Sequence, residues 1–138
     1  MAAEDRPADR ETTTRRLREQ NQLDFELEFL GGILDRDPYH ADALRVHANN
    51  LAARGHFARA LVMDRRLVRL QPDRAIPWYN LACSYAVLGM TEPAFSALRR
   101  TVDLGYPLLD HMAHDPDLKA LRHDPRFARL LREALNAG

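Results

Sequence analysis

The sequence repeats with a period of 34 residues, and this period restricts the possible folds more than any other feature. Gly55 and Gly89 each interrupt a stretch of apolar residues at helical spacing, and they lie 34 residues apart. The same interval separates four further pairs: Pro38 and Pro72, Leu44 and Trp78, Leu51 and Tyr85, and Ala60 and Ala94. Several independent matches at one period predict a helical repeat, in which each copy is two helices joined by a turn.

Glycine and proline set the boundaries of the repeated helices. The four helices are predicted over residues 41–54, 57–70, 75–88 and 91–104. Pro72 ends the first copy, because a proline pushes the residue before it out of the helical region. Gly105 ends the second copy in the same way that Gly55 and Gly89 end the helices before them. The two repeat units therefore cover residues 41–72 and 75–106.

Each copy carries an ordered pattern of small and large residues. The second copy has Trp78-x₂-Leu81-Ala82-x₂-Tyr85, then Ala94-x₃-Leu98. The first has a degenerate form, Leu44-x₂-His47-Ala48-x₂-Leu51, then Ala60-x₃-Asp64. This pattern resembles the tetratricopeptide repeat, a 34-residue helix–turn–helix unit. The resemblance implies an all-α fold, a right-handed superhelix of antiparallel helix pairs in which the alanines allow close helix packing.

The residues before the repeats are predicted to form an arm and a leading helix. Residues 1–13 mix Pro, Asp, Arg and Thr without an apolar period, so we expect a disordered arm. A leading helix is expected over residues 14–37, ending before Pro38. We expect Gly31-Gly32 to mark the close approach of a neighbouring helix. The apolar stripe of this helix comprises Leu17, Leu23, Leu27, Leu30 and Leu34, widened by Phe25, Phe29 and Ile33.

The period fails after Gly105, and residues 107–138 form a different segment. Asp115-Pro116 and Asp124-Pro125 each combine an N-cap with a first-turn proline, so two short helices are predicted to start there. The segment is similar to those that close repeat arrays in many bacterial tetratricopeptide proteins. A repeat array needs such a cap, because its last unit would otherwise expose an apolar face. The expected cap core comprises Leu108, Leu109, Met112, Leu118, Leu121, Phe127, Leu130 and Leu131. We therefore expect one tetratricopeptide-like domain over residues 14–138.

Charge is balanced overall but not along the chain. The sequence has 20 basic and 20 acidic residues, so no net field recruits nucleic acid or an anionic membrane. Residues 23–40 carry a net charge of −4, and residues 41–74 carry +4. We expect these segments to complement each other within one molecule. The alternative is a basic binding face formed by Arg59, Arg65, Arg66 and Arg69, with RNA as a weaker candidate because no aromatic residues interleave with them.

The sequence contains no arrangement typical of an active site. No serine or cysteine lies in a nucleophile motif, and no glycine-rich phosphate loop follows a strand. The single Cys83 excludes an internal disulfide and a Cys-rich zinc site. His111 and His114, and His123 beside Asp124, suggest a metal site. Asp115 and Asp124 are, however, better explained as N-caps. His47 is expected to be partly buried and hydrogen-bonded across the helix pair. We expect no enzyme, no cofactor and no metal.

The resemblance implies a protein–protein interaction module, or scaffold. A partner peptide or helix would lie in the concave groove lined by the first helix of each unit. Arg45, Asn49 and Asn80 resemble part of the carboxylate clamp by which some tetratricopeptide domains hold a partner's C-terminus. A generic peptide groove is the other form of this hypothesis. The expected groove residues are Arg45, Asn49, Tyr79, Asn80 and Cys83.

A structural role is the alternative function. The array has only two full repeats, and roughly three are normally needed for independent stability. Self-association into a weak homo-oligomer, through the leading helix or the convex face, would supply the missing contacts. No apolar run approaches the length of a membrane span, and the N-terminus lacks the apolar stretch of a secretory signal, so we expect a cytoplasmic protein.

Overall fold

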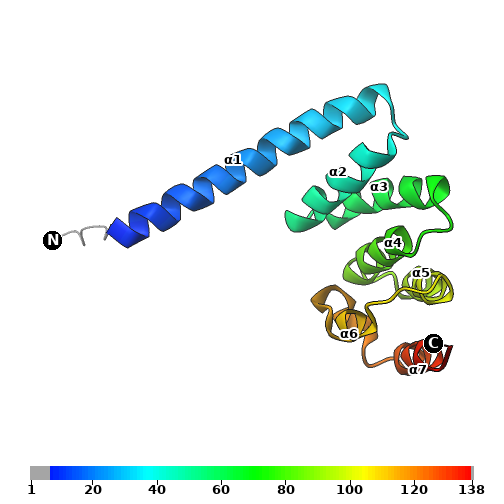
Figure 1. Ribbon diagram of the computed structural model, residues 1–138. Coiled ribbons are helices and arrows are strands. Elements are labelled where there is room, and N and C mark those ends of the chain that lie inside the picture. Colours follow the sequence, from blue (N-terminus) through cyan, green and yellow to red (C-terminus); the bar gives the residue numbers. More distant parts are fainter. Residues whose placement is uncertain (1–6, 138) are drawn as a thin grey trace.

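A computed structural model describes residues 7–137, and every regular element in that range is helical (Figure 1). The long helices are α1 (Pro7–Arg36), α2 (Ala41–Ala53), α3 (Phe57–Leu70), α4 (Ala75–Val87) and α5 (Thr91–Asp103). The C-terminal segment contains α6 (Leu109–His114), the 3₁₀ helix η1 (Pro116–Leu121) and α7 (Pro125–Ala137). The pairs α2–α3 and α4–α5 pack against each other, so the described chain is an all-α stack of helix pairs. Across this range no helix combines the length and apolar character needed to cross a membrane.

The turns inside the two repeats have the same hydrogen bonds. Gly55 and Gly89 adopt positive φ angles of 78° and 74°, a conformation that glycine reaches without steric cost. Each glycine N–H bonds to the carbonyl three residues earlier, and the next N–H, from His56 or Met90, bonds to the carbonyl five residues earlier. This pair of bonds closes the helix C-terminus. The four repeat helices begin at the residues predicted from the sequence.

The core is largest where the second helix pair meets the C-terminal segment. A smaller cluster joins α1, α2 and α3 through Leu34, Ala43, Leu44 and Leu67. The larger cluster extends from Val68 through α4 and α5 to α7. The alanines expected at close helix contacts are buried in the structure: Ala48, Ala60, Ala82 and Ala94. The C-terminal segment therefore covers the end of the array, as its apolar pattern predicts.

Helix α1 begins earlier than the sequence analysis predicts. Residues 1–6 of the expected arm lie outside the described residues, but the helix already starts at Pro7, so the expectation of disorder up to residue 13 is wrong from there on. A proline in the first turn followed by Asp9 suits a helix N-terminus. The Thr13 and Thr14 hydroxyls donate to the carbonyls of Asp9 and Arg10, each at 2.8 Å. The residues of this first part of α1 are mostly polar, so they show no apolar period from which a helix could be predicted.

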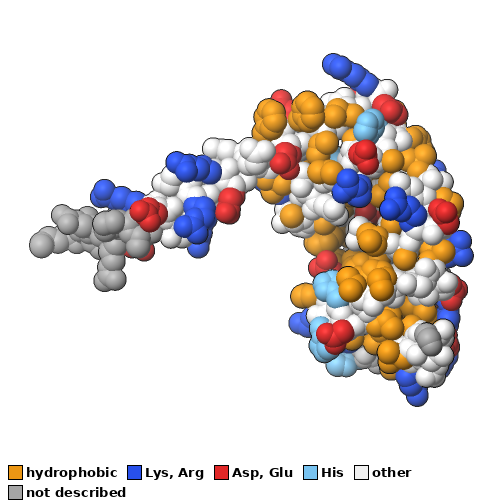
Figure 2. Space-filling view, in the orientation of Figure 1, with side chains coloured by type: hydrophobic (Ala, Val, Ile, Leu, Met, Phe, Trp, Pro, Cys, Tyr) orange, Lys and Arg blue, Asp and Glu red, His pale blue; other side chains and the backbone are white. Residues whose placement is uncertain are grey.

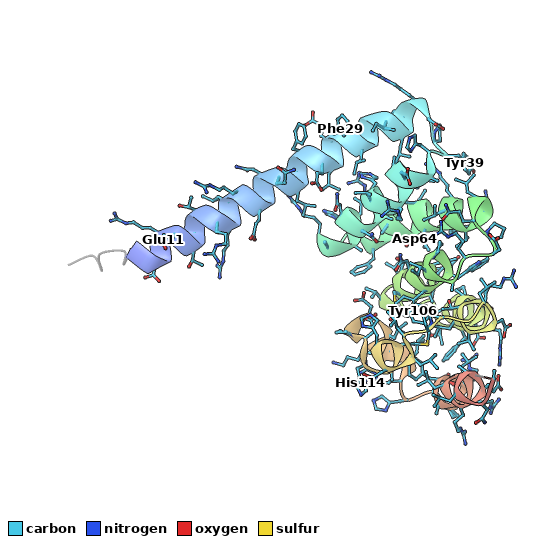
Figure 3. The ribbon with its side chains drawn as sticks, in the orientation of Figure 1. Glu11, Phe29, Tyr39, Asp64, Tyr106 and His114 are labelled. Carbon is cyan, nitrogen blue, oxygen red and sulfur yellow. The ribbon has the colours of Figure 1, made fainter. Side chains whose placement is uncertain are left out.

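The two sides of α1 differ in what covers them. Leu30, Ile33 and Leu34 pack against the smaller core cluster. Phe25 and Phe29 lie on the opposite side, with 63% and 59% of their surface exposed, and their rings stack with centroids 6.1 Å apart. Figure 3 shows Phe29 on the side of α1 that faces away from α2. The expectation that these rings widen the buried stripe is therefore wrong, because in the described part of the chain a neighbouring helix packs on one side of α1 only.

The glycine pair in α1 does not serve a contact within the described chain. A Cβ atom added at Gly31 or Gly32 would meet nothing within 4 Å. The expected close approach of a neighbouring helix is therefore wrong for this molecule on its own. Gly32 is exposed, on the same side of α1 as Phe25 and Phe29.

Within the described residues, the acidic and basic segments form an ion pair with each other at one place only. Arg54 at the end of α2 forms an ion pair with Asp24 of α1. Nearby, the Asn50 amide donates to Glu26 at 3.0 Å. In the described part of the chain, the four arginines of α3 form no ion pair with the acidic residues of α1. Most of the expected intramolecular charge complementarity is therefore not realised.

The C-terminal segment contains the two predicted N-caps and one helix that was not predicted. Oδ1 of Asp115 accepts from the N–H of Asp117 at 2.9 Å, and Oδ1 of Asp124 accepts from the N–H of Arg126 at 3.0 Å. Helix α6 precedes them. The buried members of the expected cap core are Met112, Leu118, Leu121, Phe127 and Leu130, while Leu109 and Leu131 are half-buried. Leu108 is 58% exposed, because it lies before α6 in non-helical backbone, so its assignment to the core is wrong.

Candidate functional site

The candidate site lies between the first helices of the two repeats. In Figure 1, α4 and α6 lie along one side of the stack, and α5 and α7 lie along the other. The outline of the molecule is concave on the side toward which α1 projects (Figure 2). Two pockets open between α2 and α4, and we name them after one residue of each.

The Arg45 pocket has a volume of about 340 Å³ and lies near the N-terminal ends of α2 and α4. Arg45 and Asn80 line it, together with Leu67, Ile76 and Pro77, which provide an apolar surface. The remaining lining residues are Ala41, Asp42, Gln71, Arg74, Ala75 and Pro107. The Arg45 guanidinium lies 3.9 Å from the Asp42 carboxylate, and both side chains are mostly exposed. This pocket therefore combines an accessible cation with apolar walls.

The Tyr79 pocket has a volume of about 210 Å³ and lies further along the same two helices. It is lined by the predicted residues Asn49, Tyr79, Asn80 and Cys83. Asn80 lines both pockets, so the two are neighbours along one groove. The structure thus brings all five predicted groove residues around this pair of pockets.

The predicted residues differ in how accessible they are. Arg45 and Asn49 are exposed, and Asn80 is half-buried. Tyr79 and Cys83 keep only 5% and 7% of their surface exposed. The C-terminal segment covers these two residues, so a ligand in the groove would meet Arg45, Asn49 and Asn80 first.

Asp115 connects the C-terminal segment to α4 beneath the groove. Its Oδ2 accepts a hydrogen bond from the Tyr79 hydroxyl and lies 3.9 Å from the Cys83 sulfur. Nε2 of His111 lies 3.4 Å from the same oxygen. The Tyr79 ring stacks on Tyr106 with centroids 4.6 Å apart. These contacts make Asp115 both the N-cap of η1 and the polar link between η1 and α4.

Burial and Asp115 also determine the protonation of the neighbouring groups. Burial, and then the hydrogen bond to Asp115, raise the pKa of the Tyr79 hydroxyl. Burial, and then the negative charge of Asp115, raise the pKa of the Cys83 thiol. Both groups therefore keep their protons near neutral pH, and a protonated thiol is a poor nucleophile.

A trio of potential metal ligands occurs in the same cluster. The Cys83 sulfur and carboxylate oxygens of Asp115 and Asp117 lie within 4.8 Å of one another. Oδ2 of Asp115 is already occupied by hydrogen bonds from Tyr79 and Cys83. His114 lies apart from the trio, with Nδ1 2.9 Å from the Asp110 carbonyl oxygen. The arrangement is a packed polar cluster, and we assign no metal to it.

Sequence reasoning missed a buried hydrogen bond between α3 and α4. The Ser84 hydroxyl donates to Oδ2 of Asp64 at 2.7 Å, and both side chains are buried. Burial raises the pKa of Asp64 to about 6, although the Ser84 hydrogen bond opposes the shift. The sequence contained one signal: Asp64 occupies the position at which the second copy has the apolar Leu98.

His47 is buried in α2, but one of its nitrogens lacks the expected partner. Among the described residues, Nδ1 of His47 has no hydrogen bond. The expected hydrogen bond across the helix pair is therefore wrong at this nitrogen. Burial, and then the nearby positive charge of Arg59, lower the pKa of His47.

Comparisons with known proteins give distant similarity only. No family model matches the chain. A 57-residue stretch is 28% identical to the cell division cycle protein 16 homologs of Mus musculus and Homo sapiens, covering 41% of this chain and 9% of each of those proteins. An 82-residue stretch is 33% identical to a chloroplastic protein of Arabidopsis thaliana, covering 57% of this chain and 24% of that protein. The chain thus spans at most about a quarter of the length of these relatives.

Proposed function

We propose that this chain is a tetratricopeptide-like protein-interaction module that holds a partner peptide or helix in the groove between α2 and α4. The observation that carries the proposal is the pair of adjacent pockets joined at Asn80. The distant similarity to the cell division cycle protein 16 homologs supports a general role in protein interaction. The helix pairs packed at their alanines support the repeat architecture.

The chemistry of the groove suits a peptide backbone with an apolar side chain. The Asn80 side chain has both a donor and an acceptor, so it can bond a peptide N–H and a carbonyl together. Ile76 is exposed and lies beside Pro77 in the wall of the Arg45 pocket, where a partner's apolar side chain would be covered. Arg45 offers a planar pair of donors to a carboxylate or to backbone carbonyls. These groups specify binding and do not supply a reaction, so we propose no catalysis and no cofactor.

The partner's C-terminal carboxylate is the more specific form of this proposal. Arg45 and Arg74 both line the Arg45 pocket, and Asn80 lies in the same wall. The two guanidinium groups, beside the Asn80 side-chain amide, would bind a peptide with a free C-terminal carboxylate more tightly than one with an amidated C-terminus. In a generic peptide groove, which needs no terminal carboxylate, the same residues would bond to backbone N–H and carbonyl groups of the peptide.

The test is a titration with a peptide selected by display on the whole chain. Wild type, Arg45→Ala and Asn80→Ala are titrated with the peptide, which carries a free or an amidated C-terminus. Loss of either side chain should weaken binding by about 1–3 kcal/mol, as for hydrogen bonds to charged groups. Arg129→Ala is the matched control, because Arg129 is exposed on α7. If both groove variants bind as tightly as wild type, the groove proposal is wrong.

Self-association is the second candidate function. The exposed stacked pair Phe25 and Phe29 favours it, because α1 presents apolar surface that nothing in the described chain covers. Light scattering over a range of concentrations tests this candidate. A strictly monomeric and stable chain would exclude it.

A further inference from the structure

We propose that the outer face of α1 in one copy of the chain docks on the arginine face of α3 in a second copy. The outer face comprises Phe25, Glu28, Phe29 and Gly32. The arginine face comprises Tyr39, Val62, Arg65, Arg66 and Arg69. This proposal rests on the second candidate function, self-association, and adds to it the two surfaces that meet.

The outer face of α1 is an apolar surface with an acidic edge. Phe25 and Phe29 are stacked and exposed, and Glu28 lies next to them on the same side of the helix. Figure 2 shows hydrophobic side chains standing out from this edge of α1, above the rest of the molecule. Gly32 follows one turn later and leaves the helix backbone uncovered, which permits close approach of another helix.

The arginine face of α3 has the complementary character. A pocket of about 230 Å³ lies between Tyr39, Val62, Arg65, Arg66 and Arg69. The Arg66 guanidinium lies 5.9 Å from the centre of the Tyr39 ring. The one acid of α3, Asp64, is buried on the other side of the helix and bonded to Ser84. In the described residues, none of the three arginines of this pocket forms an ion pair.

The two faces match in shape and charge. The pocket is lined by an aliphatic side chain, an aromatic ring and guanidinium groups, which are all favourable neighbours for a phenyl ring such as that of Phe29. Glu28 would then lie beside Arg65 and Arg69. The outer face lies in the segment that carries −4, and the arginines of the other face lie in the segment that carries +4. Among the described residues, Asp24 and Arg54 form the one ion pair between these segments. The other acidic and basic side chains of the two segments can therefore pair with those of a second copy.

One molecule cannot join its own two faces. Phe29 lies on the side of α1 that points away from α2, and Tyr39 lies beyond the end of α1 next to α3 (Figure 3). Because α1 is a continuous helix packed on α2, it cannot fold back onto α3. The contact is therefore between copies and joins two different faces. Such head-to-tail contacts produce rings or open chains, not a two-fold dimer.

Two variants test this arrangement by sedimentation velocity. The first variant, Phe25→Ser with Phe29→Ser, removes the outer face and keeps the arginine face. The second, Arg65→Glu with Arg69→Glu, removes the arginine face and keeps the outer face. All four side chains are exposed, so circular dichroism should show unchanged helix content. Arg129→Glu with Arg132→Glu, on exposed positions of α7, is the matched charge-reversal control.

The expected result is complementation. Wild type and the α7 control should associate with increasing concentration, and each face variant alone should associate at least about tenfold more weakly. An equimolar mixture of the two face variants should form a 1:1 complex that grows no further, because one intact face of each kind remains. A Glu28→Arg variant should also associate weakly, and combining Glu28→Arg with Arg65→Glu and Arg69→Glu in one chain should restore association, because both faces then carry the exchanged charge.

Other outcomes overturn the proposal in separable ways. If the arginine variant associates like wild type while the phenylalanine variant does not, the outer faces pair with each other. Self-association then stands, and the proposed partner face is wrong. If wild type stays monomeric at every concentration, self-association itself is wrong. Neither result affects the peptide groove.

Discussion

The Tyr79 hydroxyl donates a hydrogen bond to Oδ2 of Asp115, across 36 residues of sequence. Tyr79 lies in the groove-lining helix α4, and Asp115 caps η1 in the C-terminal segment. The same carboxylate receives the N–H of Asp117 through its other oxygen. One side chain thus fixes the start of a helix and attaches that helix to the repeat array.

Removing either partner of this hydrogen bond should destabilise the fold. Tyr79→Phe removes a buried donor and should cost about 1–3 kcal/mol of unfolding free energy. Asp115→Ala also removes an N-cap and should cost more, because a cap alone contributes about 1 kcal/mol. Urea denaturation of both variants and the double variant should give a coupling energy above about 0.5 kcal/mol. Tyr39→Phe, at an exposed tyrosine, is the control, and additive effects of Tyr79→Phe and Asp115→Ala would contradict the link.

Asp64 should make the protein less stable as the pH rises from about 4 to about 6. Its pKa in the folded chain is about 6, against 3.8 in the unfolded chain, so between these values the folded state binds more protons. Stability therefore falls with rising pH, by an amount on the order of 2–3 kcal/mol. Asp64→Asn keeps an acceptor for Ser84 and removes the titration. Its unfolding free energy should exceed that of wild type at pH 7 and approach it near pH 4.

The control for this pH effect is an acid that is not buried. Asp73→Asn removes a carboxylate from an exposed turn. Its unfolding free energy should follow that of wild type over the same pH range. If Asp64→Asn shows the same pH profile as wild type, the buried carboxylate is not the source of the dependence.

Replacing His47 by leucine should stabilise the protein. The substitution removes a buried nitrogen without a hydrogen bond among the described residues, and it restores the residue type found at the equivalent Leu81. We expect a gain of about 1–2 kcal/mol at neutral pH. The pKa of His47 is lowered in the folded chain, so wild type loses stability when the pH falls below 6.5. The stability gained by His47→Leu over wild type should therefore be larger at acidic pH. Leu81→His, the reciprocal change, should destabilise; a loss of stability in His47→Leu would show that His47 has a necessary partner.

Replacing Phe127 by alanine should destabilise the fold strongly, and replacing Phe25 by alanine should hardly change its stability. Phe127 is 4% exposed in the cap core, so Phe127→Ala should cost about 3–5 kcal/mol. Phe25 is exposed on α1, so Phe25→Ala in a monomeric sample should change stability by less than about 0.5 kcal/mol. Thermal unfolding at low protein concentration measures both. Equal effects would contradict the placement of the C-terminal segment.

The sequence predicted the features that depend on neighbouring residues. The 34-residue period located α2 to α5, because the turns at Gly55 and Gly89 need only a glycine and the residues just before and after it. The caps at Asp115 and Asp124 were predicted for the same reason. The five expected groove residues line the two pockets, and their role in binding stays a prediction.

Most of the features that were missed depend on distant parts of the chain. The Asp64–Ser84 hydrogen bond joins residues 20 apart on different helices, and no local pattern pairs them. The apolar spacing of α1 gave a wide stripe, but only the placement of α2 decides which side of it is covered. Helix α6 was missed because six residues are too few to show a period. The burial of Tyr79 could not be foreseen, because it requires the C-terminal segment to fold back over α4.

Helix α1 also has a gradient of local stability along its length. Every side chain from Asp9 to Gln22 is exposed, whereas the last turns are packed against α2. An isolated helix of about 15 residues is only marginally stable in water, and in this stretch the Gln20 carbonyl, near its end, accepts a hydrogen bond from Arg54. Backbone amides in the first half should therefore exchange with deuterium far faster than those near Leu34. A partner bound to the first half of α1 would extend the protected part of the helix towards its N-terminus. The length of α1 that is protected from deuterium exchange would therefore show whether a partner is bound there.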